Sequence, residues 1–132
     1  LAAHNCERRA RGLPPLAPST KLDAVAQYRV DDMVAEGYFA HDDPTDDPDR
    51  IDGKYFEIMR ELGIEGWRWA GENLQMNNYA DPFPVAMDRL MNSPTHRANI
   101  LDPEYTHIVA APQINNRATF VFACIYTSGG DV

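Results

Sequence analysis

The feature that most constrains the fold is a C-terminal segment, residues 118–127, that is apolar on both faces of an extended chain. Phe120, Phe122 and Cys124 alternate here with Val121 and Ala123, and successive residues of a strand point to opposite faces of a sheet. A strand with two apolar faces must be covered on both sides. We therefore expect a sheet between two layers of helices, which is a three-layer α/β/α sandwich.

A hairpin and one further strand complete the predicted sheet. Residues 106–114 and 118–127 are strand-like runs separated by a turn at Asn115-Asn116, which predicts an antiparallel pair. Residues 67–75 are aromatic and apolar enough for another strand. The expected fold class is α/β (α+β), with a central and largely antiparallel sheet.

Periodic apolar residues and helix-breaking residues predict three helices in the first half of the chain. The first covers residues 1–11. The second begins at a capping box formed by Thr20 and Asp23 and ends at Gly37. A third covers residues 51–62.

Two prolines predict where the last two helices begin. Asp81-Pro82 supplies a cap and a first-turn proline for a helix that ends at Met91, and Ser93-Pro94 repeats the signal. The repeated signal implies a short separate helix that carries His96 and closes at Asp102-Pro103.

Length and composition limit the function classes. The chain has 132 residues, 44% hydrophobic and 24% charged, which is ordinary globular composition, and we expect one domain over residues 1–132. No run approaches the roughly 18 apolar residues of a membrane span. We therefore do not expect a transmembrane protein. A net charge of −8 repels phosphate backbones, so we also expect no nucleic acid partner.

Six aspartates crowd into residues 42–52. A calcium loop is one interpretation, but the spacing and the prolines do not fit the EF-hand pattern, so a solvated acidic surface loop is favoured. The chain also lacks a phosphate-cradling glycine loop and a His-Glu-x-x-His or Gly-x-Ser-x-Gly segment. We expect no organic cofactor.

Cys6 and Cys124 are the only cysteines of the sequence. A disulfide between them would close nearly the whole chain into a loop and contribute up to about 4 to 5 kcal/mol. Two buried free thiols are the alternative, and the sequence leaves both open. The chain begins at Leu1 without a methionine or a signal-like apolar stretch, so we expect that a preceding segment has been removed.

Two histidines and a carboxylate on three separated segments are the candidate site residues. His41 follows an aromatic pair just beyond the second helix, and Glu72 follows a segment rich in tryptophan. His96 lies on the first turn of its helix, where the helix dipole lowers the pKa of an imidazole. Imidazole nitrogens and carboxylate oxygens bind metals and carry protons near neutral pH, so their convergence would define a site.

Each of these residues also has an ordinary structural interpretation. His41 could form a hydrogen bond at a helix end, His96 could be an exposed surface residue, and Glu72 could need only backbone amides as partners. Ser93 is explained as an N-cap rather than as a nucleophile. His107 lies in the hairpin and is left out of the site.

Four motifs in order resemble those of the CAP superfamily, the domain shared by cysteine-rich secretory proteins, antigen 5 and plant pathogenesis-related proteins, in its short bacterial form. The match covers nearly the whole chain, and the matching stretches are His4-Asn5-Cys6-Glu7-Arg8, Gly71-Glu72-Asn73-Leu74, residues 93–101, and Cys124-x-Tyr126 with Gly129-Gly130. The resemblance implies a single SCP-like domain with an α/β/α sandwich. It also implies a secreted or cell-surface protein.

The cleft of this family carries two histidines and two acidic residues. By this resemblance, His41, Glu72 and His96 match three of these four. Ser93 stands where the second carboxylate would be, which weakens any mechanism that needs two carboxylates. His4, Asn5 and Arg8 are implied to be scaffold rather than site.

The leading hypothesis is a non-enzymatic extracellular binding domain. Its cleft, lined by His41, Glu72, Ser93 and His96, would take a divalent cation such as zinc through the two histidines, and a small or lipidic ligand. A metal-dependent, protease-like hydrolase that uses the same cleft is the second hypothesis. A protein–protein interaction domain with a vestigial cleft is the third, and the sequence names no protein partner.

Overall fold

The structure is a computed structural model that describes residues 1–42 and 53–129. These residues form five helices and four strands. In chain order they are α1 (Ala2–Arg9), β1 (Ala17–Pro18), α2 (Thr20–Glu36), α3 (Lys54–Glu61), β2 (Ala70–Asn77), α4 (Pro82–Met91), α5 (Pro94–Ile100), β3 (His107–Ile114) and β4 (Phe120–Thr127). The predicted acidic loop lies, apart from Asp42, outside the described residues.

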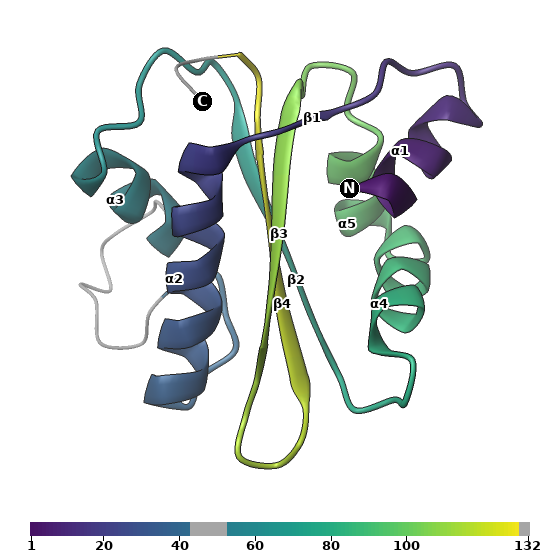
Figure 1. The fold of residues 1–132 in the computed structure, drawn as a ribbon. Coiled ribbons are helices and arrows are strands. Elements are labelled where there is room, and N and C mark those ends of the chain that lie inside the picture. The colour runs from purple at the N-terminus through teal and green to yellow at the C-terminus, as the bar shows by residue number, and fades with distance from the viewer. Residues whose placement is uncertain (43–52, 130–132) are drawn as a thin grey trace.

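The sheet separates two layers of helices, as the two apolar faces of β4 require (Figure 1). The strand order is β1-β3-β4-β2, and β4 pairs antiparallel with both of its neighbours, whereas β1 pairs parallel with β3. Helices α2 and α3 cover one face, and α1, α4 and α5 cover the other (Figure 1). The predicted three-layer α/β/α sandwich with a largely antiparallel sheet is confirmed.

Each face of β4 belongs to a different hydrophobic core. Val121, Ala123 and Ile125 pack into the core beneath α2 and α3. Cys124 and Tyr126 pack into a second core with residues of α4 and α5. The alternation along this one strand therefore joins the three layers into one molecule.

Helix α2 leads the chain to the candidate site. Its N-cap is Ser19, whose hydroxyl accepts a hydrogen bond from the backbone N–H of Leu22 at 3.1 Å, so the predicted capping residue Thr20 is instead the first helical residue. The helix ends, as predicted, at Gly37, which has a φ of +70°. Glycine adopts this left-handed conformation without steric cost, and the chain turns there toward His41.

Three predicted boundaries were wrong by a few residues. The first helix ends at Arg9, and the third begins at Lys54, with Gly53 at its N-cap. The strand predicted over residues 67–75 begins only at Ala70, because Trp67 packs its ring against Phe56 of α3 instead of pairing in the sheet.

Two features of the hairpin region also differ from the prediction. The turn predicted at Asn115-Asn116 is a longer loop, because the side-chain oxygen of Asn115 accepts hydrogen bonds from the backbone N–H groups of Arg117 and Thr119. Strand β4 consequently begins at Phe120. The two-residue strand β1 was not predicted, and it lies at the edge beside β3.

Polar residues fasten α1 to the rest of the fold. The side chain of Arg8 is fully buried and donates hydrogen bonds to the carbonyls of Pro14, Ile100 and Asp102 at 2.8 to 2.9 Å. The Nε2 of His4 lies 2.6 Å from the hydroxyl of Tyr126. These contacts fit the scaffold role expected for His4 and Arg8, and those of Arg8 hold the end of α5, the helix that carries His96.

Candidate functional site

The structure brings two of the predicted residues into direct contact and holds the third beside them. The Nδ1 of His41 lies 2.8 Å from Oε1 of Glu72 in β2. Helix α5 packs on the same strand, because the side chain of Asn73 donates to the carbonyl of His96 at 2.9 Å. The side chain of Asn99 also donates to the carbonyl of Glu72 at 3.4 Å.

Glu72 is a buried carboxylate with both oxygens engaged. Its side chain is fully buried and forms an ion pair with Arg29 of α2. Oε2 accepts from Arg29 Nε at 2.8 Å, and Oε1 accepts from Arg29 Nη2 at 3.2 Å as well as facing His41. Two-point contact with a guanidinium fixes the plane of a carboxylate. The position of Glu72 is therefore set from α2.

Arg29 connects the carboxylate to the segment that leads to His41. It donates to the hydroxyl of Tyr38 at 2.8 Å and to the carbonyl of Ala40, and Tyr38 in turn donates to Asp32. Burial disfavours the charged guanidinium, but the hydrogen bond and the charge of Glu72 outweigh it and raise the pKa of Arg29. A charged network thus spans α2, the segment after it and β2.

Sequence reasoning missed Arg29, although the sequence holds a signal for it. Arg29 lies on the face of α2 that also carries Val25, Ala26, Val30 and Met33, and all of these residues are buried. An arginine at helical spacing among core residues needs a buried partner of opposite charge. Glu72, flanked by small and amide residues in a strand, was available as that partner.

His41 presents one nitrogen to the carboxylate and leaves the other outside. A carboxylate only accepts hydrogen bonds, so Nδ1 carries the hydrogen that faces Glu72, and in the neutral form of the ring Nε2 then holds a lone pair. The side chain of His41 is 53% exposed. This nitrogen is therefore free to bind a ligand from solvent.

His96 is held by Ser93. Its Nδ1 lies 2.8 Å from the Ser93 hydroxyl, and Ser93 occupies the N-cap position of α5 without a side-chain bond to the helix backbone. The predicted N-cap role of Ser93 is thus wrong in its chemistry, because its hydroxyl binds the imidazole instead. The pKa of His96 is lowered, as predicted, but the causes are burial first and the positive charge of His41 second rather than the helix dipole.

The expected common cleft is two hollows that follow one another along β2. The first, with a volume of about 340 Å³, is lined by residues that include His41 and Glu72, and we call it the His41 cavity. The second, of about 230 Å³, is lined by residues that include Ser93 and His96, and we call it the His96 cavity. Within the described ranges, no group of three or more His, Cys, Asp or Glu side chains is placed to hold one metal ion.

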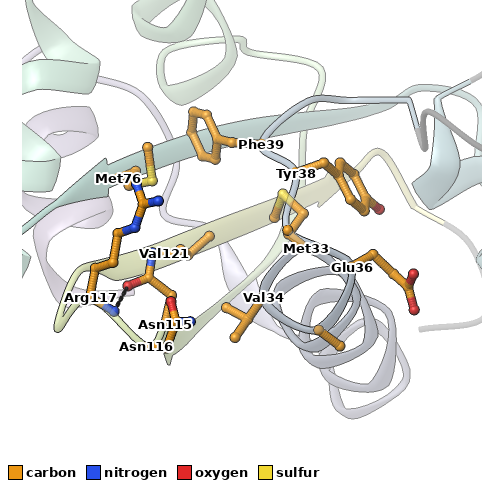
Figure 2. Close-up of a pocket in the computed structure, with 12 residues that line it drawn as sticks. Met33, Val34, Glu36, Tyr38, Phe39, Met76, Asn115, Asn116, Arg117 and Val121 are labelled. Carbon is orange, nitrogen blue, oxygen red and sulfur yellow. Dashed lines mark hydrogen bonds between the residues drawn. The ribbon is translucent and has the colours of Figure 1, made fainter.

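A larger cavity of about 490 Å³ lies at the tip of the hairpin, next to the His96 cavity (Figure 2). Phe39 and Met76 line both. Figure 2 shows them above Val121 of β4, with Met33 at the end of α2 and Arg117 of the hairpin loop at the rim. None of these residues was predicted to belong to a site. The hollow surface therefore extends beyond the histidines toward the hairpin.

Both cysteines are free thiols, which contradicts the disulfide interpretation. Cys124 is buried in β4, and burial raises its pKa to about 12. Cys6 is exposed, because α1 turns His4, Asn5 and Arg8 toward the fold and Cys6 therefore points away from it. His107, which was left out of the site, lies in β3 with its Nδ1 2.8 Å from the hydroxyl of Thr106.

In the part of the chain that the structure describes, no helix combines the length and the apolar character needed to cross a membrane.

A family model and one relative match most of the chain. The model of the cysteine-rich secretory protein family, CAP, matches residues 1–126. Protein YkwD of Bacillus subtilis (strain 168), which is uncharacterized, is 36% identical over 104 residues. The match covers 79% of this chain and 37% of YkwD, so the chain spans little more than a third of that relative.

Solved structures resemble the fold over nearly the whole chain. An extracellular protein containing an SCP domain from Bacillus anthracis has a TM-score of 0.74 at 24% identity, with 96% of this chain and 38% of that chain covered. An outer surface protein from Borrelia burgdorferi has a TM-score of 0.76 at 13% identity, with 96% and 87% covered. At these identities the likeness is one of fold.

Proposed function

Because the chain belongs to the cysteine-rich secretory protein (CAP) family, we propose that it is a secreted or cell-surface binding domain without catalytic activity, in which His41 and His96 bind a divalent cation such as zinc. The extracellular and outer surface proteins that share its fold support the location. The net charge of −8 favours attraction of cations to its surface.

The contact between His41 and Glu72 carries this proposal. Histidines that bind metals commonly donate their other ring N–H to a carboxylate, which fixes the ring and makes the ligating nitrogen more basic. The Oε1 of Glu72 lies 2.8 Å from Nδ1, and Arg29 binds the other carboxylate oxygen, which supports this role. The exposed Nε2 of His41 is then the metal-binding atom.

His96 supplies the second nitrogen. Metal ligation requires a neutral imidazole, and burial, the largest cause, lowers the pKa of His96 and so favours that form. When Nδ1 of His96 donates to the Ser93 hydroxyl, Nε2 keeps its lone pair for the cation. A serine hydroxyl can accept this hydrogen bond. Ser93 would therefore orient the ring of His96 as Glu72 orients the ring of His41.

The donor set suits an open metal site. Two imidazoles leave zinc with free positions, which water or a small or lipidic ligand with an anionic group would fill. The bound cation would supply the positive charge that attracts such a group. Among the described residues, the lack of a third protein donor argues against a closed structural site.

The state of Glu72 argues against the hydrolase hypothesis. A general base needs a free oxygen to accept a proton from water. Both oxygens of Glu72 are already hydrogen-bonded, one to Arg29 alone and one to Arg29 and His41. Ser93 offers no second carboxylate.

Calorimetric titration with zinc chloride tests the proposal on three proteins. We expect binding by the wild type, loss of binding in the His41→Ala/His96→Ala double variant, and retained binding in the control variant His107→Ala, which removes a histidine outside the site. A folded double variant that binds zinc as the wild type does would refute the metal role of the pair. Circular dichroism of each variant verifies the fold.

A further inference from the structure

The outer edge of β2 can be assigned residue by residue. In the described part of the chain, strand β2 lies at the end of the sheet order and pairs only with β4. Ser128 N–H donates to the carbonyl of Trp69 at 2.9 Å, and these residues continue the register that pairs Ala70 with Thr127. Backbone groups of successive residues point to alternate sides in an antiparallel pair. The residues whose N–H and C=O point away from β4 are therefore Ala70, Glu72, Leu74 and Met76.

Side chains occupy three of these four carbonyls. The donors are Tyr55 for Ala70 at 3.4 Å, Asn99 for Glu72 at 3.4 Å and Gln75 for Met76 at 3.0 Å. Leu74 differs, because both of its backbone groups point away from β4 and, within residues 1–42 and 53–129, no side chain or loop backbone forms a hydrogen bond with either of them. The agreement of these three bonds with the register confirms which groups face outward.

Leu74 lines the His96 cavity, which lies between two walls. Phe39 forms one wall, and Leu90 of α4 and His96 of α5 form the other. Leu74 is only 6% exposed, and a buried backbone group without a partner is costly. Phe39 and Met76 also line the cavity at the hairpin tip, so the two cavities adjoin.

We propose that an extended peptide segment binds along the outer edge of β2 as an added strand, with one of its residues exchanging both backbone hydrogen bonds with Leu74. The N–H of one edge residue donates to the C=O of one residue in an extended partner, and its C=O accepts from the N–H of that same partner residue. An open sheet edge recognises a peptide in this way. The edge groups thereby define the chemical class of the ligand.

The walls define which side chains the peptide carries. The peptide residue opposite Leu74 faces the same side of the sheet as Leu74, toward Phe39, and its two neighbours face Leu90 and His96. Apolar side chains fit both walls. The net charge of −8 repels acidic peptides, so the ligand is an apolar, neutral or basic segment.

Selection from a display library of short linear peptides tests this inference, run once with EDTA and once with zinc chloride. The strongest binder is then synthesised in two forms, unmodified and N-methylated at its central apolar residue. We expect N-methylation to weaken binding about tenfold or more, because it removes one backbone hydrogen bond. In amide NMR spectra, the Leu74 signal should shift on binding more than that of Gln75, which faces β4.

A pair of exposed apolar residues provides matched variants. Phe39→Asp places a charge in the His96 cavity and should abolish binding, whereas Leu62→Asp, at an exposed residue outside that cavity (52% against 42% for Phe39), should not. The inference is overturned if no peptide is enriched, if the N-methylated form binds equally, or if the shifted amides lie away from Leu74. The peptide inference does not depend on the cation. If the protein binds peptide in EDTA but binds no zinc, only the metal proposal is refuted. If it binds zinc but no peptide, only the peptide inference is refuted.

Discussion

The buried histidine of the first helix should make the stability of the protein depend on pH. His4 is 5% exposed, and its Nε2 lies 2.6 Å from the Tyr126 hydroxyl. Burial, the largest cause, lowers its pKa from 6.5 to about 4. In the unfolded chain the same ring binds a proton below about pH 6.5. Between this pH and about 4 the folded state does not bind that proton, so unfolding is coupled to proton uptake.

The size of the effect follows from the two pKa values. The interval from 6.5 to about 4, at about 1.36 kcal/mol per pH unit, corresponds to about 3 kcal/mol. This stability is fully present above pH 6.5, falls as the pH drops toward 4, and is gone below that. Since domains of this kind are stable by about 5 to 15 kcal/mol, the loss is a large share of the whole.

Urea denaturation of the wild type and of His4→Gln, at a series of pH values between 7.5 and 4, measures how much free energy of unfolding His4 contributes at each pH. Glutamine can still form a hydrogen bond with Tyr126 but does not titrate, and every other ionisable group is shared by the two proteins. The wild type should be the more stable protein at pH 7.5, and its advantage should shrink by about 3 kcal/mol as the pH falls to 4. A difference that stays constant over this interval would refute the reasoning.

Two further predictions concern the buried ion pair and the thiols. Arg29→Met should lower the free energy of unfolding by about 3 to 5 kcal/mol, because it leaves Glu72 as an uncompensated buried charge; thermal denaturation measures the loss, and a melting temperature equal to that of the wild type would contradict it. The native protein should react with a thiol reagent such as DTNB at Cys6 only, and Cys124 should react only after unfolding, because it is buried and its thiol pKa is raised to about 12. Two fast-reacting thiols in the native state would contradict this prediction, because Cys124 of β4 would then be accessible to the reagent.

The layers of the fold were predictable because their signals are local. The alternation of apolar residues in β4 required cover on both faces, and Pro82 and Pro94 marked the starts of α4 and α5. Strand β1 has two residues and exists only because β3 offers an edge to pair with. No property of its own sequence could have revealed it.

The first helix shows why local patterns fail at polar cores. All of its buried residues are polar, namely His4, Asn5 and Arg8, so hydrophobic periodicity gave no indication of which face turns inward. The exposure of Cys6 follows from that face. The disulfide therefore could not be decided before the structure was known.

Three members of the candidate site could be proposed from the sequence, but its geometry could not. His41, Glu72 and His96 were recognised from their chemistry and from the family resemblance. That His41 and His96 line successive hollows depends on how Glu72 and Leu74 follow one another in β2. The partner that fixes Glu72, Arg29, lies 43 residues away in sequence, and only tertiary packing joins them.

The place of β4 in the sheet has a consequence for biosynthesis. Among the four described strands, β4 comes last in chain order and lies between β3 and β2, so both of those strands lack their shared partner until residues 120–127 have left the ribosome. During synthesis this sheet must therefore remain incomplete until β4 is available, and its exposed apolar segments are natural targets for chaperones.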